Sequence, residues 1–172
     1  MDQFGVIDIL VNNAGIIIKS PLLDMTENDW DRLMSVDLKG YYLCSQAVGK
    51  RMIQQKKGKM INIASQYAFK VTPGMGVYSI AKAGVVMLTR VLAQELGSYG
   101  IRANTIAPCL VRTEFSRPSW SDPELLKQIE ASIPLGRVAE TGDLVGAALF
   151  LASDASSFIT GHTILVDGGT LA

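Results

Sequence analysis

Four short apolar segments recur along the chain, and their spacing constrains the fold more than any other feature. They cover residues 7–11, 60–64, 103–107 and 163–166, and each is bounded by Gly, Pro, Asn or Asp. Runs of this length are typical of strands that are buried on both faces of a parallel sheet. Parallel neighbours need long crossover connections, usually helices, and the intervening segments are long enough to supply them. The sequence therefore predicts an α/β fold.

Helical periodicity fills the spaces between these segments. Apolar residues at three- and four-residue steps predict crossover helices over residues 30–47 and 78–96, the first after a capping-box-like start at Thr26. A further helix is expected over residues 144–152. Prolines interrupt this alternation at about 113–142, which we interpret as an inserted helical flap over the substrate.

Composition excludes several classes of protein. Sixteen basic and sixteen acidic side chains give a formal net charge of zero, which argues against a nucleic-acid or anionic-membrane partner. The two cysteines, Cys44 and Cys109, are too few for a disulfide framework or a zinc site, and no metal is expected. The start does not resemble a signal peptide, and no apolar stretch reaches the roughly 18 residues of a membrane span. We therefore expect one soluble, cytoplasmic domain over residues 1–172.

Polar residues of catalytic type follow the predicted strands. Tyr78 and Lys82 are four residues apart, so they share one face of a helix, where an ammonium would lower the pKa of the phenol. Ser65, residues 12–15 and Pro108 each follow a strand, and the carboxyl ends of parallel strands are where ligands bind. A Tyr-x-x-x-Lys pair by itself is more often an ordinary helix surface. The convergence of three strand ends favours a catalytic role.

At these positions the chain resembles the short-chain dehydrogenase/reductase family over essentially its whole length. The motifs that carry the resemblance are Asp8-Ile-Leu-Val-Asn-Asn-Ala-Gly15, Ile61-Asn-Ile-Ala-Ser65, Tyr78-Ser-Ile-Ala-Lys82, Arg102-Ala-Asn-Thr-Ile-Ala-Pro108, and Gly161 through Asp167-Gly-Gly169. The resemblance implies a Rossmann-type doubly wound parallel sheet. The chain would carry strands 4 to 7 of the family order 3-2-1-4-5-6-7 and lack the first three.

The resemblance also implies a role for each catalytic residue. Tyr78 would be the acid/base, Lys82 would lower its pKa and hold the nicotinamide ribose, and Ser65 would orient the substrate carbonyl. Hydride would move between the substrate and NAD or NADP. Asp37 stands where the family usually completes a tetrad with asparagine, and an ionised carboxylate only accepts hydrogen bonds. We expect Asp37 to be tolerated with a changed proton relay.

Further residues are implied as contacts of the cofactor. They are Asn13, Ala14, Gly15, Tyr78, Lys82, Pro108, Cys109, Val111 and Thr113. Cys109 stands where the family commonly has glycine and is expected to narrow the site, and Val111 would offer backbone groups to the carboxamide. Thr113 would offer a hydroxyl to the cofactor or serve equally well as a helix N-cap. His162 opens the last strand, where the family has packing contacts, and is not expected to be catalytic.

No Gly-x-x-x-Gly-x-Gly motif precedes Asn12, so the resemblance implies a truncated chain that lacks roughly 80 residues for the cofactor's adenosine side. Residues 1–6 would match the end of the family's third helix and the lead into its fourth strand. The first strand would then form an exposed edge.

Two functional hypotheses remain open at this point. One is the catalytic part of an oxidoreductase acting on a carbonyl or secondary alcohol of a sugar acid, polyol or 3-oxoacyl compound. The other is a non-catalytic remnant or interaction subunit that pairs with intact relatives. The family resemblance also implies a homotetramer. Its contacts would involve the crossover helices that bear Tyr41, Tyr42, Met87 and Leu88, although these side chains would fit an intramolecular core equally well.

Overall fold

The computed structural model describes residues 5–172, and the expectation for the first four residues lies outside that range. The predicted strands form one parallel sheet in the order β1-β2-β3-β4. They are β1 (Ile9–Asn12), β2 (Gly58–Ile63), β3 (Ile101–Pro108) and β4 (Thr163–Val166). The α/β fold class is therefore confirmed, with β1 and β4 at the two edges of the described sheet. Their numbering as strands 4 to 7 of the family stays a prediction.

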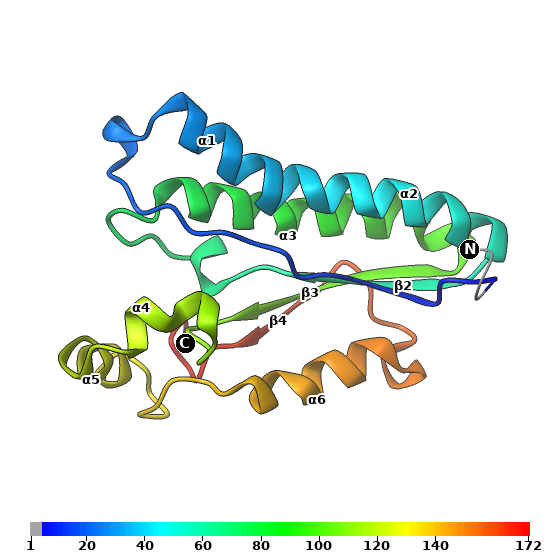
Figure 1. The fold of residues 1–172 in the computed structure, drawn as a ribbon. Helices are drawn as coiled ribbons and strands as arrows, with labels where there is room; N and C mark the ends of the chain where they lie inside the picture. The colour runs from blue at the N-terminus through cyan, green and yellow to red at the C-terminus, as the bar shows by residue number, and fades with distance from the viewer. Residues whose placement is uncertain (1–4) are drawn as a thin grey trace.

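Helices cover both faces of this sheet (Figure 1). On one face lie α1 (Glu27–Met34), a π-helical turn (Ser35–Lys39), α2 (Gly40–Gln55) and α3 (Gly76–Leu96), and on the other lies α6 (Thr141–Ala152). Alternate strand residues serve the two layers: Met60 packs in the α2 and α3 layer, whereas Ile61 packs against α6. Because both faces are buried, the strands appear in the sequence as continuous apolar runs.

The predicted helix start at Thr26 is confirmed, because its Oγ1 accepts a hydrogen bond of 3.1 Å from the Asp29 backbone N–H.

The absence of a membrane-length apolar stretch is a wrong prediction. The helical stretch Gly76–Tyr99 is long and apolar enough to cross a membrane by length and composition, although half of its most apolar window is buried inside the fold. A core helix of a soluble protein has the same properties.

The helix between β1 and β2 contains a turn that periodicity did not predict. The Gly40 N–H bonds to the Ser35 carbonyl, which is the five-residue step of a π-helix. Around this turn Leu33, Asp37 and Tyr41 recur every fourth residue and are all buried. A four-residue step exceeds the 3.6 residues of an α-helical turn, so the wider π turn keeps these three side chains on one face.

The segment expected to form a flap carries a 3-10 turn (Glu114–Ser116), α4 (Arg117–Trp120) and α5 (Pro123–Ala131). Figure 1 shows α4 and α5 beyond the carboxyl ends of the strands. The end of the segment is tied to the C-terminal turn, because the Leu135 N–H donates to the Gly168 carbonyl at 3.1 Å. Gly168 has a φ of +62°, and a Cβ there would lie 2.7 Å from Ile133, so this contact needs glycine.

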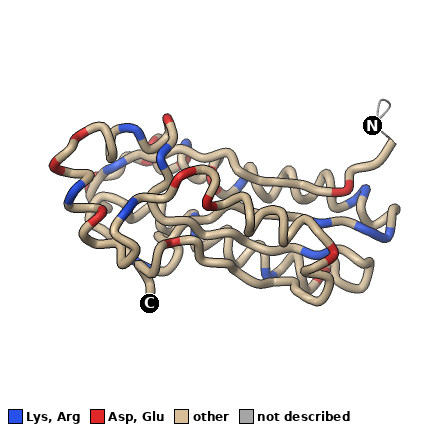
Figure 2. Tube along the Cα trace, turned by 90° about the horizontal axis from the view of Figure 1, so that it is seen from below, with Lys and Arg blue, Asp and Glu red and all other residues tan. Residues whose placement is uncertain are grey.

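Charged residues of both signs are interspersed along the chain (Figure 2). Among the ion pairs of residues 5–172, four include at least one exposed partner, as in Lys59–Asp154 at 2.9 Å. The pair between Lys82 and Asp37 differs, because its side chains are only 4% and 0% exposed. That buried pair lies next to Tyr78.

Candidate active site

Ser65 is positioned by the end of β2. The strand is extended by a hydrogen bond of 2.8 Å from the Ala64 N–H to the Ile106 carbonyl, and the chain then turns into a 3-10 helix (Gln66–Ala68). Ser65 caps this helix, with its Oγ accepting from the Tyr67 N–H at 3.2 Å. The serine is buried at the carboxyl end of the sheet, as the sequence predicted.

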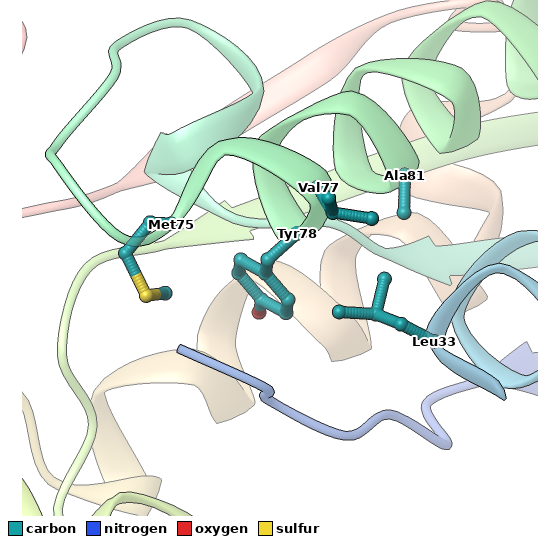
Figure 3. Packing of buried hydrophobic residues seen from close by; sticks show 5 residues of the cluster. All are labelled: Leu33, Met75, Val77, Tyr78 and Ala81. Carbon is teal, nitrogen blue, oxygen red and sulfur yellow. The ribbon is translucent and has the colours of Figure 1, made fainter. Parts of the chain in front are cut away.

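Tyr78 lies in the first turn of α3 and is 6% exposed. Its ring lies between Met75 and Leu33 (Figure 3), and the ring of Tyr67 meets it edge-on with centroids 6.2 Å apart. Burial raises the pKa of Tyr78 above its ordinary value, and the Asp37 carboxylate raises it further, while hydrogen bonding with Ser65 lowers it. The phenol is therefore held in its protonated form.

Lys82 lies one turn further along α3, and its ammonium has three oxygen neighbours. Nζ is 3.2 Å from Asp37 Oδ2, 3.4 Å from the Tyr41 hydroxyl and 3.3 Å from the Ile63 carbonyl. It also lies 5.5 Å from the centroid of the Tyr78 ring. Tyr78 and Lys82 therefore share one face of α3, as their spacing predicts.

Asp37 enters this group from the π turn. Its Oδ1 accepts a hydrogen bond of 2.8 Å from the Ile16 backbone N–H, and its Oδ2 faces Lys82. Burial raises the pKa of Asp37, an effect that the nearby ammonium opposes, and burial lowers the pKa of Lys82, which the carboxylate opposes. The sequence predicts that Asp37 is tolerated with a changed proton relay, and the structure gives it a direct contact with Lys82.

The expected lowering of the Tyr78 pKa by Lys82 does not occur in this arrangement. The ammonium is paired with the carboxylate of Asp37, and the charge of Asp37 acts on the phenol in the opposite direction. The sequence spacing located Tyr78 and Lys82. It did not reveal that Asp37 pairs with Lys82 and so opposes the effect of the ammonium on the pKa of Tyr78.

Gly15 brings the loop after β1 into direct proximity with this pair. A Cβ at Gly15 would lie 3.1 Å from Asp37 Oδ2 and 3.5 Å from Lys82 Nζ. Asn13 and Ala14 precede it and are exposed at the carboxyl end of the strand. Of these three residues predicted to contact a cofactor, Gly15 lies beside the Asp37–Lys82 pair.

Pro108 ends β3 opposite Val166 of β4, and the Cys109 N–H continues the pairing with a 3.1 Å bond to the Val166 carbonyl. Burial raises the pKa of the Cys109 thiol, so the thiol form is favoured. Cys109 lines a hollow between the strand ends and the flap segment. The other residues of its lining are Leu135, Arg137, Ala139, Asp143, Val166 and Gly168.

Val111 and Thr113 are fixed by contacts within their own loop. The Val111 carbonyl accepts a hydrogen bond from the Ser116 hydroxyl, and the Thr113 N–H donates to Ser116 Oγ at 3.2 Å. Thr113 is the N-cap of the 3-10 turn, which is one of its two alternatives. Its contact with a cofactor stays a prediction.

His162 is exposed at the start of β4, and its backbone N–H donates to Asn104 Oδ1 at 3.0 Å.

Tyr41 is a site residue whose role the sequence did not reveal. The sequence leaves an interface and an intramolecular core equally open for it; Tyr41 is 2% exposed, which confirms the core alternative. Its hydroxyl donates to the Ile63 carbonyl at 3.0 Å and accepts from Lys82. Its position four residues after Asp37 places it on the same helix face, and this spacing was the available signal.

The chain matches a known family along almost its entire length. The family model described as enoyl-(acyl carrier protein) reductase covers residues 1–170. D-threitol dehydrogenase of Mycolicibacterium smegmatis is 42% identical over 169 residues, which is 97% of this chain and 64% of that protein. The 2-dehydro-3-deoxy-D-gluconate 5-dehydrogenase of Escherichia coli is 42% identical over 171 residues, or 99% and 68% of the two chains.

Solved structures of similar proteins also match the chain along almost its entire length. A gluconate 5-dehydrogenase from Burkholderia cenocepacia, crystallised with NADP and tartrate, superimposes with a TM-score of 0.96 at 41% identity, covering 98% of this chain and 66% of that one. The chain thus spans about two thirds of the length of the relatives it matches. From its fold, its motifs and these similarities, the chain belongs to the short-chain dehydrogenase/reductase family.

Proposed function

We propose that residues 1–172 carry the catalytic and nicotinamide-facing part of an NAD- or NADP-dependent oxidoreductase. The observation that carries this proposal is the position of Tyr78. Its phenol lies near Ser65 at the end of β2, and the Lys82 ammonium is 5.5 Å from its ring. Ser65, Tyr78 and Lys82 form the catalytic group, with Asp37 beside them.

The edge formed by the strand ends suits a nicotinamide and its ribose. Gly15 has no side chain where a Cβ would press against the Asp37–Lys82 pair, so backbone and site approach closely there. Lys82 would hold the ribose hydroxyls, and the backbone around Val111 would hold the carboxamide. When bound, a nicotinamide supplies or accepts the hydride. Cys109, Pro108, Thr113, Asn13 and Ala14 complete the proposed cofactor contacts, all of them on the nicotinamide side.

The chain's own residues would orient the substrate and transfer the proton to or from its oxygen. Ser65 donates a hydrogen bond to the carbonyl oxygen of the substrate and orients it. In reduction the O–H bond of Tyr78 breaks as the proton passes to that oxygen, while the carbonyl carbon receives hydride, so an alcohol and a phenolate result. In oxidation the phenolate takes the proton of the alcohol as hydride leaves the carbon. Proton transfer by a positioned side chain is worth about 10²- to 10⁴-fold in rate.

The substrate class we propose is a secondary alcohol or ketone of a sugar acid, polyol or 3-oxoacyl compound. Support comes from relatives whose names include D-threitol dehydrogenase, gluconate 5-dehydrogenase and 3-oxoacyl-[acyl-carrier-protein] reductase. Two similar structures are described with bound NADP. The helical segment at 113–142 would cover the substrate, because it lies beyond the carboxyl ends of the strands (Figure 1).

An absorbance assay with NADH and NADPH and a panel of these ketones tests the proposal. Because the proposed contacts are on the nicotinamide side, we expect slow turnover that falls about 10²- to 10⁴-fold in Tyr78→Phe. That substitution keeps the ring among Leu33 and Met75, so the melting temperature should change little. Tyr99→Phe alters an exposed tyrosine and is the matched control. Turnover that survives in Tyr78→Phe would contradict the assignment.

We further propose that the chain assembles with copies of itself through α2 and α3, within a cytoplasmic homotetramer. Of the four residues expected on these helices, Tyr42 and Met87 are 46% and 54% exposed and suit such a contact. Tyr41 and Leu88 instead pack within the chain.

One observation favours a second role as an interaction subunit. On β1, Ile9 and Val11 are 42% and 53% exposed, because α6 packs against β2, β3 and β4. An apolar strand at an edge is suited to pairing with another chain. Light scattering of mixtures with an intact relative would detect such pairing, and a complex that forms equally well with Tyr78→Phe would support a role independent of catalysis.

A further inference from the structure

We propose that Asp37 is a positioning residue that acts as the counter-ion of Lys82 and so biases the site toward carbonyl reduction. Its carboxylate pairs with the ammonium that would otherwise stabilise the Tyr78 phenolate, and the phenol keeps the proton it must donate. This inference rests on the proposed function, because the bias matters only if Tyr78 exchanges a proton with a substrate.

The geometry fixes the carboxylate at both oxygens. Oδ1 accepts from the Ile16 N–H at 2.8 Å, and Oδ2 lies 3.2 Å from Lys82 Nζ. The Asp37 side chain is 0% exposed, so water does not screen its charge. The π turn that presents Asp37 is itself held by the hydrogen bond from Gly40 to Ser35. The carboxylate therefore stays where it faces Lys82.

Among the described residues, the Lys82 ammonium donates hydrogen bonds to the Tyr41 hydroxyl and the Ile63 carbonyl and forms an ion pair with Asp37, rather than bonding to the phenol. A lysine ammonium has three N–H donors. The three oxygens around Nζ are those of Asp37 at 3.2 Å, Tyr41 at 3.4 Å and Ile63 at 3.3 Å. Nζ lies over the Tyr78 ring, 5.5 Å from its centroid. A cation at that distance whose charge is matched by a closer anion gives a phenolate little net stabilisation.

The acidic neighbours of Tyr78 act on its pKa in one direction. Asp37 faces the phenol from the π turn, and Tyr67 faces it from the 3-10 turn after Ser65; both raise the pKa of Tyr78. Burial raises the pKa of the Tyr41 phenol on α2, and the same carboxylate raises it further. Lys82 is the cation of this group, and it is paired.

The consequence is a directional preference. Reduction starts from the protonated phenol, whose O–H bond breaks as its proton goes to the carbonyl oxygen and hydride goes from the reduced nicotinamide to the carbonyl carbon. Oxidation starts from the phenolate, which the Asp37 charge disfavours. Asp37→Asn keeps the shape and a hydrogen-bond acceptor for Ile16 but removes the charge. Lys82 is then uncompensated, and the phenolate becomes accessible at lower pH.

Titration of Tyr78 by NMR with Cζ-labelled tyrosine tests this without cofactor or turnover. Tyr78→Phe identifies the Tyr78 signal, and the exposed Tyr42 and Tyr99 serve as internal references. We expect the Tyr78 signal to titrate about 1 to 3 pH units lower in Asp37→Asn than in the wild type. Asp154→Asn removes an exposed carboxylate that pairs with Lys59 and should leave the Tyr78 signal unchanged.

An unchanged or higher titration midpoint of Tyr78 in folded Asp37→Asn would overturn the inference. A second measurement needs no variant: NMR of wild-type protein labelled at aspartate Cγ should show Asp37 ionised at neutral pH, and a protonated Asp37 would remove the counter-ion and overturn the inference. Because neither titration depends on catalysis, failure of the proposed function would appear separately, in the Tyr78→Phe assay.

Discussion

At the scale of single residues, the buried charges of Asp37 and Lys82 stabilise each other and are costly apart. Burial raises the pKa of Asp37 and lowers the pKa of Lys82, which means that each charged form is disfavoured by desolvation. We predict that Lys82→Met alone lowers the free energy of unfolding by about 3–5 kcal/mol, because it leaves a buried carboxylate without a partner.

The double variant Asp37→Asn/Lys82→Met is predicted to recover most of that loss. Urea unfolding of the wild type, the two single variants and the double variant gives the coupling energy. A double variant whose loss equals the sum of the two single losses would show that the pair is not coupled.

Gly15 is predicted to be essential for the packing of the same pair. In Gly15→Ala the added methyl would lie 3.1 Å from Asp37 Oδ2, which is tighter than an ordinary contact. Overpacking of this kind costs about 1–3 kcal/mol. Gly146→Ala is the matched control, since a Cβ in that part of α6 meets nothing within 4 Å and should stabilise the helix by about 0.5–1 kcal/mol. Thermal melts of both variants check the prediction, and equal stability would contradict it.

Single residues also show where sequence-based prediction reached its limit. Tyr78 and Lys82 could be placed together because four residues make about one helical turn. Asp37 contacts Lys82 from another helix, and no local spacing encodes a contact between distant segments. The Ile16 N–H and the Ile63 carbonyl were equally hidden, since backbone groups leave no mark in the sequence.

At the scale of elements, α6 begins with a cluster of charged surface residues, and this cluster makes the stability of the helix depend on pH. Asp143 accepts from Arg137 at 2.7 and 2.9 Å and from the Glu140 N–H at 2.8 Å. These hydrogen bonds lower the pKa of Asp143 to about 2 from an ordinary 3.8. The pKa of Asp143 is lower in the folded protein than in the unfolded chain. The hydrogen bonds of ionised Asp143 therefore stabilise the fold above about pH 4, and this stabilisation is lost as the pH falls through about 2.

We predict that Asp143→Asn reduces the acid dependence of the melting temperature between about pH 5 and pH 2. Asp122→Asn is a suitable control, because Asp122 caps the neighbouring helix α5. An acid dependence that is identical in wild type and Asp143→Asn would contradict the account of this helix start.

The elements themselves were largely readable from the sequence. The run at 163–166 coincides with β4, and the other three strands differ from their apolar runs by one to two residues at each end. Strand ends moved because pairing with a neighbour, rather than apolarity, decides where a strand stops. The π turn was not predicted, since apolar periodicity averages over a single wide turn.

At the scale of the whole molecule, the exposed faces of α2 and α3 are predicted to mediate assembly. Met87 is a large apolar side chain that is 54% exposed on α3, so Met87→Lys should reduce the mass measured by light scattering. Leu23→Lys makes the same change at a 97% exposed position outside these helices and is the matched control. Equal masses for the two variants would argue against this interface.

The layer arrangement of the molecule was predictable from the connections of a parallel sheet. Parallel strands joined by crossover helices fix two helical layers around a sheet, and the structure has them. The substrate and the coenzyme preference were not readable, because they depend on side chains that meet in space from several loops.

Saturation-transfer NMR of the chain with NADH and NADPH tests whether these residues form the nicotinamide side of a cofactor site. We predict that the nicotinamide protons and those of its ribose receive saturation more strongly than the adenine protons. The effect should weaken in Asp37→Asn/Lys82→Met, the double variant predicted to keep most of its stability. Saturation confined to the adenine protons, or unchanged in that double variant, would contradict the account.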